Sequence, residues 1–368
     1  MQTTTLLLAG DVMTGRGIDQ VLAHPGPARL FEAWVRDARD YVRLAEAKNG
    51  PVPAPVDPAY VWGDALAAMD RAAPELRIVN LETAVTRSED AWPGKGIHYR
   101  MHPANVGCLT AARLDACTLA NNHVLDWGRA GLRETLATLA GAGIRTAGAG
   151  LDAAGALAPA ALPLPGPRRV LLTARATPDS GVPAAWAASA AAAGIALLDA
   201  LDADAADDLA AQVERVRRPG DISVVSLHWG GNWGFDIPAA HRAFAHRLID
   251  RGAADLVHGH SSHHALPIEV HRGRAILYGC GDLLNDYEGI ETRGDLRSDL
   301  GCLYLVRLAP DGALQQLEIL PMQLRRLRLA HADAQARAWL RRAFGEHGRP
   351  LGTGVDDGPE GRFVLRWR

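Results

Sequence analysis

The sequence predicts an α/β sandwich with mainly parallel strands, because short apolar segments alternate with segments of helical periodicity over most of the chain. A second observation supports this fold class: several apolar segments end directly in polar residues, as Thr4–Ala9 does at Gly10-Asp11. In a parallel sheet the carboxyl ends of the strands lie on one edge, where the following loops build functional sites. The sequence therefore predicts a fold class and the edge at which its chemistry lies.

The first half of the chain shows this alternation most clearly. Strands are expected at Thr4–Ala9, Leu76–Val79, Ala116–Leu119 and Ile144–Thr146. Between them, helical spacing of apolar residues is found at Ala59–Ala72, Ala104–Arg113 and Arg129–Ala142.

The second half continues the pattern and then changes to hairpins. Strands are expected at Arg169–Thr173, Ile222–Leu227 and Asp255–His258, and helices at Ala205–Arg217 and Pro238–Arg251, the latter with a proline near its start. Turn sequences at Arg272-Gly273 and Pro310-Asp311-Gly312 then predict antiparallel pairs. Their strands are Pro267–Val270 with Ala275–Tyr278, and Cys302–Leu308 with Leu314–Ile319.

A chain of 368 residues fits one large domain with additions. We expect this domain to span residues 1–324, with insertions near 33–56 and 174–194. Residues 325–368 are expected to form a C-terminal helix, over Arg325–Phe344, and a tail packed on the domain. The basic residues of that helix are typical of a solvated face, and docking of a partner is the alternative.

The formal net charge of −3 gives no sign of binding to nucleic acid or to an anionic membrane. The first residues contain no signal segment, and no apolar stretch reaches the length of a membrane helix. We therefore expect a cytoplasmic protein whose four widely spaced cysteines are free thiols. The oligomeric state is left open.

Six polar residues share one position in the predicted fold, within a few residues of the end of an apolar strand. Alone, each has an ordinary explanation, since an Asp or Asn can cap a helix and a single His is usually a satisfied polar group. Together they are better explained by a common site at the edge of the sheet. These residues are Asp11, Glu82, Asn122, His123, His228 and His260.

Carboxylates combined with imidazoles are typical ligands of Zn²⁺, Mn²⁺ or Fe, so we expect one or two divalent metal ions. A glutamate can bridge two cations, and two metals about 3.5–4 Å apart would clamp the attacking and leaving oxygens of a displacement. The segment His258–His264 contains four histidines, more than one short loop supplies as ligands. From these we select His260 and His263.

The motifs at these strand ends resemble the CapA family, the capsule or poly-γ-glutamate synthesis proteins related to calcineurin-like metallophosphoesterases. The resemblance covers roughly residues 5–290, and the motifs follow the family order. They are Gly10-Asp-Val-Met13 with Gly15-Arg16, Asn80-Leu-Glu82, Ala120-Asn-Asn-His123 with Asp126 and Gly128, Gly148-Ala-Gly150, His228-Trp-Gly230 and Gly259-His-Ser-Ser-His263.

The resemblance implies a four-layer αββα sandwich of the metallophosphoesterase type with mixed sheets and a metal site at the strand ends. It implies that one metal is held by Asp11, Glu82 and His263, and a second by Glu82, Asn122, His228 and His260. His123 would act near the leaving group as a general acid or as a donor to the transition state. Arg16 and Lys95 would meet an anionic substrate.

Three departures from the family pattern concern the metals and the pocket. Met13, as in CapA-like proteins, stands where metallophosphoesterases usually have a histidine, which leaves the first metal fewer ligands and makes a single metal possible. Asn232 occupies an acidic position of the family and is followed by Trp233, so both are expected at the substrate pocket. The segment Gly279–Leu283 replaces Ser-Leu-Gly-Asn-Phe, which points to a substrate other than a capsule polymer.

Three functions remain open from the residues. The first is a metal-dependent hydrolase whose activated water attacks a phosphate ester or a related anionic substrate, either a small molecule or a polymer. The second is amide chemistry on a γ-glutamyl-type bond, and the third is a non-catalytic, metal-stabilised protein that binds a polymer. His123 favours an enzyme. Asp126 either offsets the metal charge next to His123, which makes it part of the catalytic group, or caps a helix.

Overall fold

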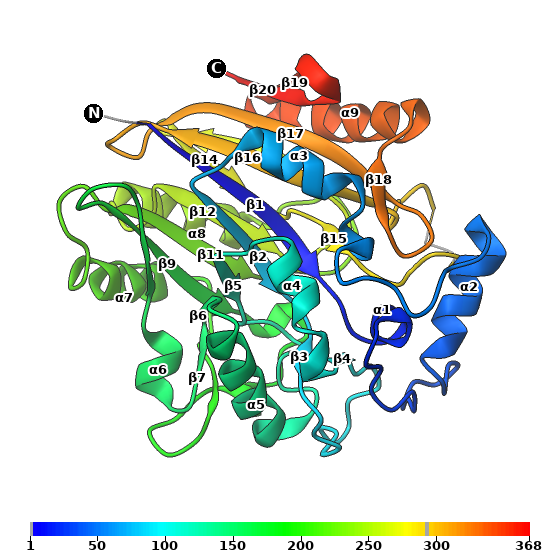
Figure 1. Cartoon of the computed structure of the whole chain (residues 1–368). Helices are drawn as coiled ribbons and strands as arrows, with labels where there is room; N and C mark the ends of the chain where they lie inside the picture. Colours follow the sequence, from blue (N-terminus) through cyan, green and yellow to red (C-terminus); the bar gives the residue numbers. More distant parts are fainter. Residues whose placement is uncertain (1–2, 291–293) are drawn as a thin grey trace.

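The computed structural model describes residues 3–290 and 294–368 and shows a mixed α/β protein (Figure 1). Among these residues the strands form two large mixed sheets, one of ten strands and one of six, and two short two-stranded sheets. The predicted α/β class with mixed sheets is confirmed.

The ten-stranded sheet contains the first strand of the chain at its centre. Its strands are β1 (Thr4–Val12), β2 (Leu76–Leu81), β5 (Ala116–Thr118), β6 (Arg145–Ala147), β15 (Asp282–Leu284), β16 (Leu300–Leu308), β17 (Leu314–Leu324), β18 (Leu329–His331), β19 (Thr353–Asp357) and β20 (Phe363–Trp367). Their main order is β19-β20-β17-β16-β1-β2-β5-β6, with β15 added beside β1 and β18 beside β17. β1, β2, β5 and β6 are parallel, and β16 begins an antiparallel half.

The six-stranded sheet has the order β13-β14-β12-β11-β9-β8. Its strands are β8 (Ala160–Pro163), β9 (Arg169–Ala176), β11 (Ile222–His228), β12 (Leu256–His260), β13 (Ile268–His271) and β14 (Arg274–Leu277). The four central strands are parallel and the two outer strands are antiparallel. The short sheets pair β3 (Ala84–Val85) with β4 (Arg100–Met101), and β7 (Ala149–Gly150) with β10 (Gly194–Ile195).

Both faces of the six-stranded sheet are buried. Val225 and Leu227 on one face pack in a cluster with α7 (Ala203–Glu214) and α8 (Ala239–Asp250), which lie on the outer side of the sheet (Figure 1). Val224, on the opposite face of the same strand, belongs to the core cluster that contains Leu6 and Leu8 of β1. The large core therefore joins the two sheets.

The remaining helices are α1 (Gly17–Val21), α2 (Arg39–Asn49), α3 (Asp64–Ala72), α4 (Gly107–Ala111), α5 (Gly128–Gly141), α6 (Ala153–Leu157) and α9 (Ala334–Gly348). The helix expected over Ala59–Ala72 is interrupted at Gly63, between a 3₁₀ turn and α3. Gly63 has a φ of 44°, and a Cβ there would lie 2.1 Å from the carbonyl oxygen of Leu329. Close packing of Gly63 against β18 thus interrupts the helix that the apolar spacing predicts.

The helix predicted over Arg325–Phe344 is wrong in its first part. β17 continues to Leu324, and Arg326 and Leu327 then adopt positive φ angles in the turn that leads to β18. The helix begins only at Ala334, where the Asp333 side chain caps it by accepting from the backbone N–H of Ala336. The residues after α9 form β19 and β20, and β20 extends the sheet by pairing with β17.

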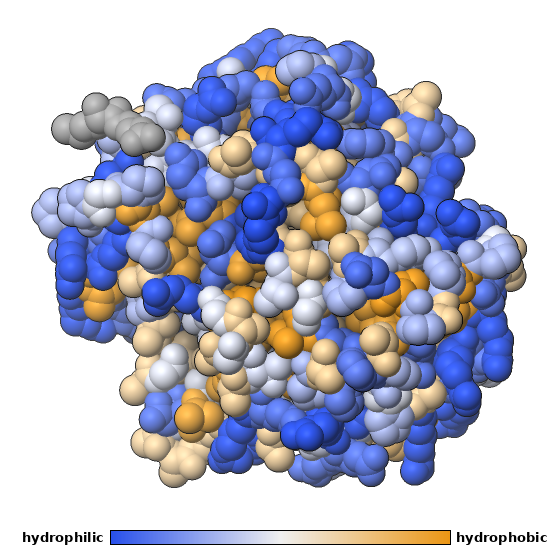
Figure 2. Space-filling view, viewed as in Figure 1, coloured by the Kyte–Doolittle hydropathy of each residue, from blue (hydrophilic) through white to orange (hydrophobic). Residues whose placement is uncertain are grey.

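The two expected insertions contain short elements: α2 lies within residues 33–56, and two 3₁₀ turns lie within residues 174–194 after the end of β9. All four cysteines are buried and unpaired. None of the described helices has the length and apolar character needed to cross a membrane. On the face drawn in Figure 2, apolar residues lie in separate patches among polar ones.

Candidate metal centre

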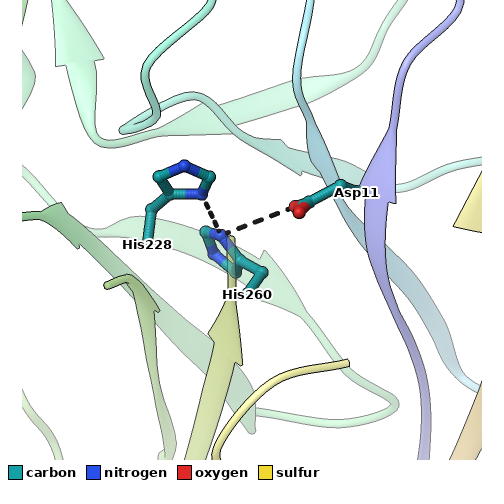
Figure 3. Close-up of side chains that lie close together, drawn as sticks. All are labelled: Asp11, His228 and His260. Carbon is teal, nitrogen blue, oxygen red and sulfur yellow. Dashed lines mark hydrogen bonds and ion pairs between the residues drawn. The ribbon is translucent and has the colours of Figure 1, made fainter. Parts of the chain in front are cut away.

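The carboxyl ends of strands from both sheets meet at one place. Asp11 lies near the end of β1, and His228 and His260 are the last residues of β11 and β12. Their side chains point toward one another from these strands (Figure 3), and one ligand atom of each lies within 4.8 Å of the others. All three are buried, so the strand-end positions do bring distant residues together.

The contact between the two histidines is close and unusual. The Nδ1 atoms of His228 and His260 are 2.8 Å apart, and the Nδ1 atom of His260 lies 3.8 Å from an Asp11 carboxylate oxygen. The other ring nitrogen of His228, Nε2, lies 3.2 Å from the side-chain oxygen of Asn122. Nε2 must carry the hydrogen toward that oxygen, since an amide oxygen only accepts. The Nδ1 atom of His228 then presents a lone pair.

Asp11 is held in place by two donors. The Asn80 amide donates to one carboxylate oxygen at 2.6 Å, and the backbone N–H of Ser261 donates to the other at 3.1 Å. The parallel register of β1 and β2 places Asn80 beside Asp11, and that of β1 and β15 places Asp282 beside it. Burial, followed by the charge of Asp282, raises the pKa of Asp11 to about 7.

Glu82 gives a further indication of a cation. Burial and the neighbouring Asp11 raise its pKa well above the ordinary value, and its Oε2 atom is buried without a hydrogen-bond partner in the described part of the chain. A positive ion would relieve both the mutual repulsion of these carboxylates and the unpaired oxygen. Carboxylate oxygens and imidazole nitrogens together suit Mn²⁺, Zn²⁺ or Fe. The residues therefore fit a divalent cation.

His263 lies beside this group with both of its ring nitrogens engaged. Its Nδ1 atom lies 2.9 Å from an Asp282 oxygen, and its Nε2 atom lies 3.0 Å from the Asn232 amide nitrogen. Burial disfavours the charged ring, yet Asp282 outweighs it and raises the pKa of His263. A ligand role for His263 requires one of these contacts to open, and it stays a prediction.

His123 faces the carboxylates from the turn after β5. Its Nε2 atom lies 3.6 Å from Glu82, and its Nδ1 atom donates to Asp126 at 2.7 Å. Asp126 also accepts from Lys95 at 2.6 Å and from the backbone N–H of Tyr99 at 2.6 Å. Burial lowers the pKa of His123 to about 4. The ring is therefore neutral at pH 7, with its Nε2 lone pair toward the site.

The helix-capping alternative for Asp126 is wrong. The N-terminal cap of α5 is Trp127, and no side chain caps that helix end. The Asp126 carboxylate instead contacts His123 and Lys95. Burial raises the pKa of Asp126, but the contacts with His123 and Lys95 outweigh burial, and the pKa is lowered. The charge of the Asp126 carboxylate is thus matched by its neighbours.

Two predicted substrate-binding cations are engaged within the protein. Arg16 is buried, and its guanidinium donates to Asp286 and, at 2.9 Å, to Glu32, while its face lies 3.8 Å from the Tyr41 ring centroid. The Lys95 ammonium contacts Asp126 and lies 3.0 Å from the Nδ1 atom of His123. A substrate anion must therefore compete with carboxylates of the protein for either cation.

The other predicted pocket residues lie nearer the surface. Asn232 and Trp233 are exposed on the loop after β11, and the Trp233 ring centroid is 5.2 Å from that of His263. Asn122 is partly exposed, in contrast to the buried His123. These three residues are therefore accessible to a substrate arriving from solvent.

Two residues near the centre, Asp282 and Ser226, were absent from the sequence prediction, and a third, His258, was considered in the histidine cluster but not selected. Asp282 lies within the segment noted above for its departure from the family pattern. Ser226 and His258 each lie two residues before a predicted ligand on the same strand face. The period of two along a strand was a usable signal for both.

A cavity of about 800 Å³ is lined by residues of α9, β19 and β20 and of the turn between them, including Arg341, Arg349 and Arg366. None of the strand-end residues lines it. The candidate centre therefore rests on converging buried ligand atoms and carboxylates of raised pKa, which are typical of functional sites.

The fold and the site together define the class of protein: a mixed α/β protein in which buried carboxylates and histidines at the strand ends form a candidate metal centre. The family described as "Bacterial capsule synthesis protein PGA_cap" matches residues 5–287, and the chain belongs to this family. That match includes every strand-end residue described above. The resemblance to the CapA family is thereby confirmed.

Several relatives are similar to the chain. A protein named "Probable polyglutamine synthesis accessory protein" from Mycobacterium tuberculosis, found in strains CDC 1551 / Oshkosh and H37Rv, is 49% identical over 358 residues, covering 97% of this chain and 94% of the relative. "PGA biosynthesis protein CapA" of Bacillus subtilis strain 168 is 26% identical over 292 residues, covering 77% of this chain and 64% of the relative. "Capsule biosynthesis protein CapA" of Bacillus anthracis is 22% identical, covering 78% and 61%.

Proposed function

We propose that the chain is a metal-dependent hydrolase in which an activated water attacks a phosphate ester or a related anionic substrate. The observation that carries this proposal is the convergence of Asp11, His228 and His260 at the strand ends, all buried. A metal site with a purely structural role has little need for a further histidine beside its ligands. His123 is such a histidine, and it therefore favours catalysis. Its Nε2 atom faces Glu82 across 3.6 Å.

A specific type of fold belongs to the proposed hydrolase function. We propose that the two large sheets and their helices form a four-layer αββα sandwich of the metallophosphoesterase type. Support comes from α7 and α8 on the outer face of the six-stranded sheet and from the core cluster that joins the other face to β1. This arrangement would place the ends of β1, β2, β11 and β12 around one site.

In the proposed centre, Asp11, His228 and His260 hold one divalent cation, and Glu82 and Asn122 complete its surroundings. A second ion would use Glu82, Asp11 and His263, with His263 released from Asp282 or Asn232. A bound cation would supply Lewis-acid activation of a substrate oxygen and make a water acidic enough to attack at neutral pH. The proposal includes a centre with one bound ion and a centre with two.

The chain's own residues would handle the proton and the substrate. His123 would exchange a proton with the reacting oxygen through Nε2, because Nδ1 is fixed by Asp126 at 2.7 Å. Asp126 would stabilise the charged ring when the proton arrives, and Lys95 would oppose it. Asn232 and Trp233, exposed beside His263, would contact the part of the substrate nearer solvent.

Purified protein reconstituted with Mn²⁺, Zn²⁺ or Fe²⁺ should be assayed against phosphomonoesters, phosphodiesters and γ-glutamyl amides. Metal-dependent turnover of a phosphate ester, lost in Asp11→Asn, is the expected result. Absence of turnover on all three classes by the metal-loaded protein contradicts the hydrolase proposal.

A second candidate is favoured by the names of the relatives, which refer to polyglutamine synthesis and PGA biosynthesis. The same centre would then act on a γ-glutamyl-type amide, since both reactions develop negative charge on oxygen that the same ligands stabilise. The word accessory in one of these names also favours a non-catalytic role, in which a metal-stabilised protein binds an anionic polymer. Turnover of the amide, or polymer binding without turnover, would identify these alternatives.

A further inference from the structure

Four buried side chains form a block on one face of the six-stranded sheet. Alternate residues of a strand share a face, so Ser226 lies beside His228 on β11, and His258 beside His260 on β12. The parallel register pairs Ser226 with His258 and His228 with His260. His228 and His260 are proposed ligands, whereas Ser226 and His258 have no role in the proposed function.

The hydrogen bonds of this block have a fixed direction at one end. The Nε2 atom of His258 lies 2.9 Å from the carbonyl oxygen of Ala9 on β1. A carbonyl oxygen only accepts, so Nε2 of His258 must carry the hydrogen. In the neutral ring, Nδ1 of His258 then has a lone pair, directed at the Ser226 hydroxyl 3.1 Å away.

The direction propagates through Ser226. Its hydroxyl has a single hydrogen, which it donates to His258, so its oxygen can only accept from the other neighbour. That neighbour is the Nε2 atom of His260, 2.8 Å away. Nε2 of His260 must therefore carry its hydrogen, and its Nδ1 atom presents a lone pair toward His228 and Asp11.

We propose that His258 and Ser226 are positioning residues that hold His260 in its Nε2–H tautomer and turn its Nδ1 lone pair to the cation. The cation itself rests on the proposed function, whereas the tautomer follows from the contacts on β1, β11 and β12. Outer partners of this kind orient a histidine ligand, and their loss typically weakens metal binding by about 10–100-fold. Neither residue touches the reacting atoms.

His123 provides an internal contrast. Its Nδ1 atom donates to the Asp126 carboxylate at 2.7 Å, so it has the opposite tautomer, Nδ1–H. Long-range ¹H–¹⁵N correlation spectra of the full-length, chelator-treated protein, labelled with ¹⁵N-histidine, distinguish the two forms. We expect Nε2–H for His258 and His260 and Nδ1–H for His123. An Nδ1–H tautomer at His260 in this spectrum overturns the proposal.

Ser226→Ala tests the consequence for binding, with Ser223→Ala as its matched control. Ser223 is also buried on β11, but its hydroxyl donates to the carbonyl oxygen of Ala253 at 2.6 Å, far along the strand from the ligands. Titration calorimetry with Mn²⁺ or Zn²⁺ should show about 10–100-fold weaker binding for Ser226→Ala and unchanged binding for Ser223→Ala. The Ser226→Ala spectrum should show His260 as a mixture of tautomers.

The results of these experiments distinguish the positioning role of Ser226 and His258 from the proposed metal-dependent function. A folded Ser226→Ala protein with wild-type affinity overturns the positioning role. If Ser226→Ala does not fold, the tautomers of the wild-type chain still decide the proposal. If the wild-type chain binds no divalent ion, the proposed function fails, while the tautomer of His260 still confirms or refutes the relay on its own.

Discussion

His228 and His260 face each other through their Nδ1 atoms at 2.8 Å, at the ends of two neighbouring parallel strands. Their outer nitrogens are engaged elsewhere, with Asn122 and with Ser226. Two lone pairs at this distance repel unless a proton or a cation lies between them. The Asp11 carboxylate on the facing strand supplies the negative charge that favours a cation.

His228→Ala and His260→Ala should each lose bound metal without unfolding the chain. Each variant removes one donor at a strand end, and the core clusters of apolar residues remain intact. We expect the affinity for Mn²⁺ or Zn²⁺ to fall by more than the about 10–100-fold that loss of an outer partner causes. Titration calorimetry measures the affinity, and circular dichroism checks the fold.

His271→Ala is the control for removal of an imidazole. His271 pairs with Asp250 at 2.8 Å on β13 and is no part of the strand-end group. This variant should bind metal as the wild type does. Equal metal binding by all four proteins would rule out His228 and His260 as ligands.

His123→Ala should keep its metal and its fold but lose turnover by roughly 10²–10⁴-fold, the usual contribution of a placed proton-transfer group. The reason is the free Nε2 atom, 3.6 Å from Glu82, on a ring whose Nδ1 is held by Asp126. Steady-state kinetics on an unactivated ester measures the loss, which should shrink for an activated aryl ester. Loss of the metal instead would make His123 a ligand.

Asp126→Asn and Lys95→Met should shift the pH dependence of turnover in opposite directions. The Asp126 charge raises the pKa of His123 and the Lys95 charge lowers it, although burial is the largest influence. The limb of the pH–rate profile that reports His123 should therefore move to lower pH in Asp126→Asn and to higher pH in Lys95→Met. Movement of both variants in the same direction would contradict the electrostatic assignment.

Without metal, the contribution of Asp11 to the stability of the fold should fall as the pH rises toward neutrality. Burial and Asp282 raise the folded-state pKa of Asp11 from 3.8 to about 7. A raised pKa stabilises the fold fully below the unfolded value, and this contribution disappears as the pH rises from about 4 to about 7. The buried histidines, whose pKa values are lowered, have the opposite effect between about pH 4 and 6.5, so denaturant unfolding in chelator has to compare the wild type with a variant that lacks the Asp11 carboxylate.

Asp11→Asn is the matched variant for this experiment, because it keeps the shape of the side chain and removes its titration. Relative to the variant, the wild type should lose free energy of unfolding as the pH rises from 4 to 7. Added Mn²⁺ or Zn²⁺ should restore stability only to the wild type at neutral pH. The same slope in both proteins would argue against a perturbed Asp11.

The sequence was sufficient to predict the central strands and the edge where the site lies. β1, β2, β11 and β12 were found because their apolar segments are short and end in polar residues. The C-terminal region was harder to predict. The Asp333 cap is a local signal that the prediction missed. The strand β20, by contrast, depends on its pairing with β17, which no local pattern reveals.

The site could be predicted as a set of residues but not as a network. Asp11, His228 and His260 were identified by position, and they do converge. Arg16 pairs with Asp286, which is distant in the sequence, and His263 contacts Asp282. Both contacts depend on the long-range pairing of β15 with β1. Tertiary contacts of this kind are invisible to residue spacing.

The most direct test of the central claim is elemental analysis of the purified wild-type chain after dialysis against Mn²⁺, Zn²⁺ or Fe²⁺ and removal of free metal. We expect about one or two tightly bound divalent ions per chain, and loss of the ion held by Asp11, His228 and His260 in the double variant His228→Ala/His260→Ala. A wild-type chain that retains no divalent ion, or a double variant that retains as much as the wild type, would contradict it.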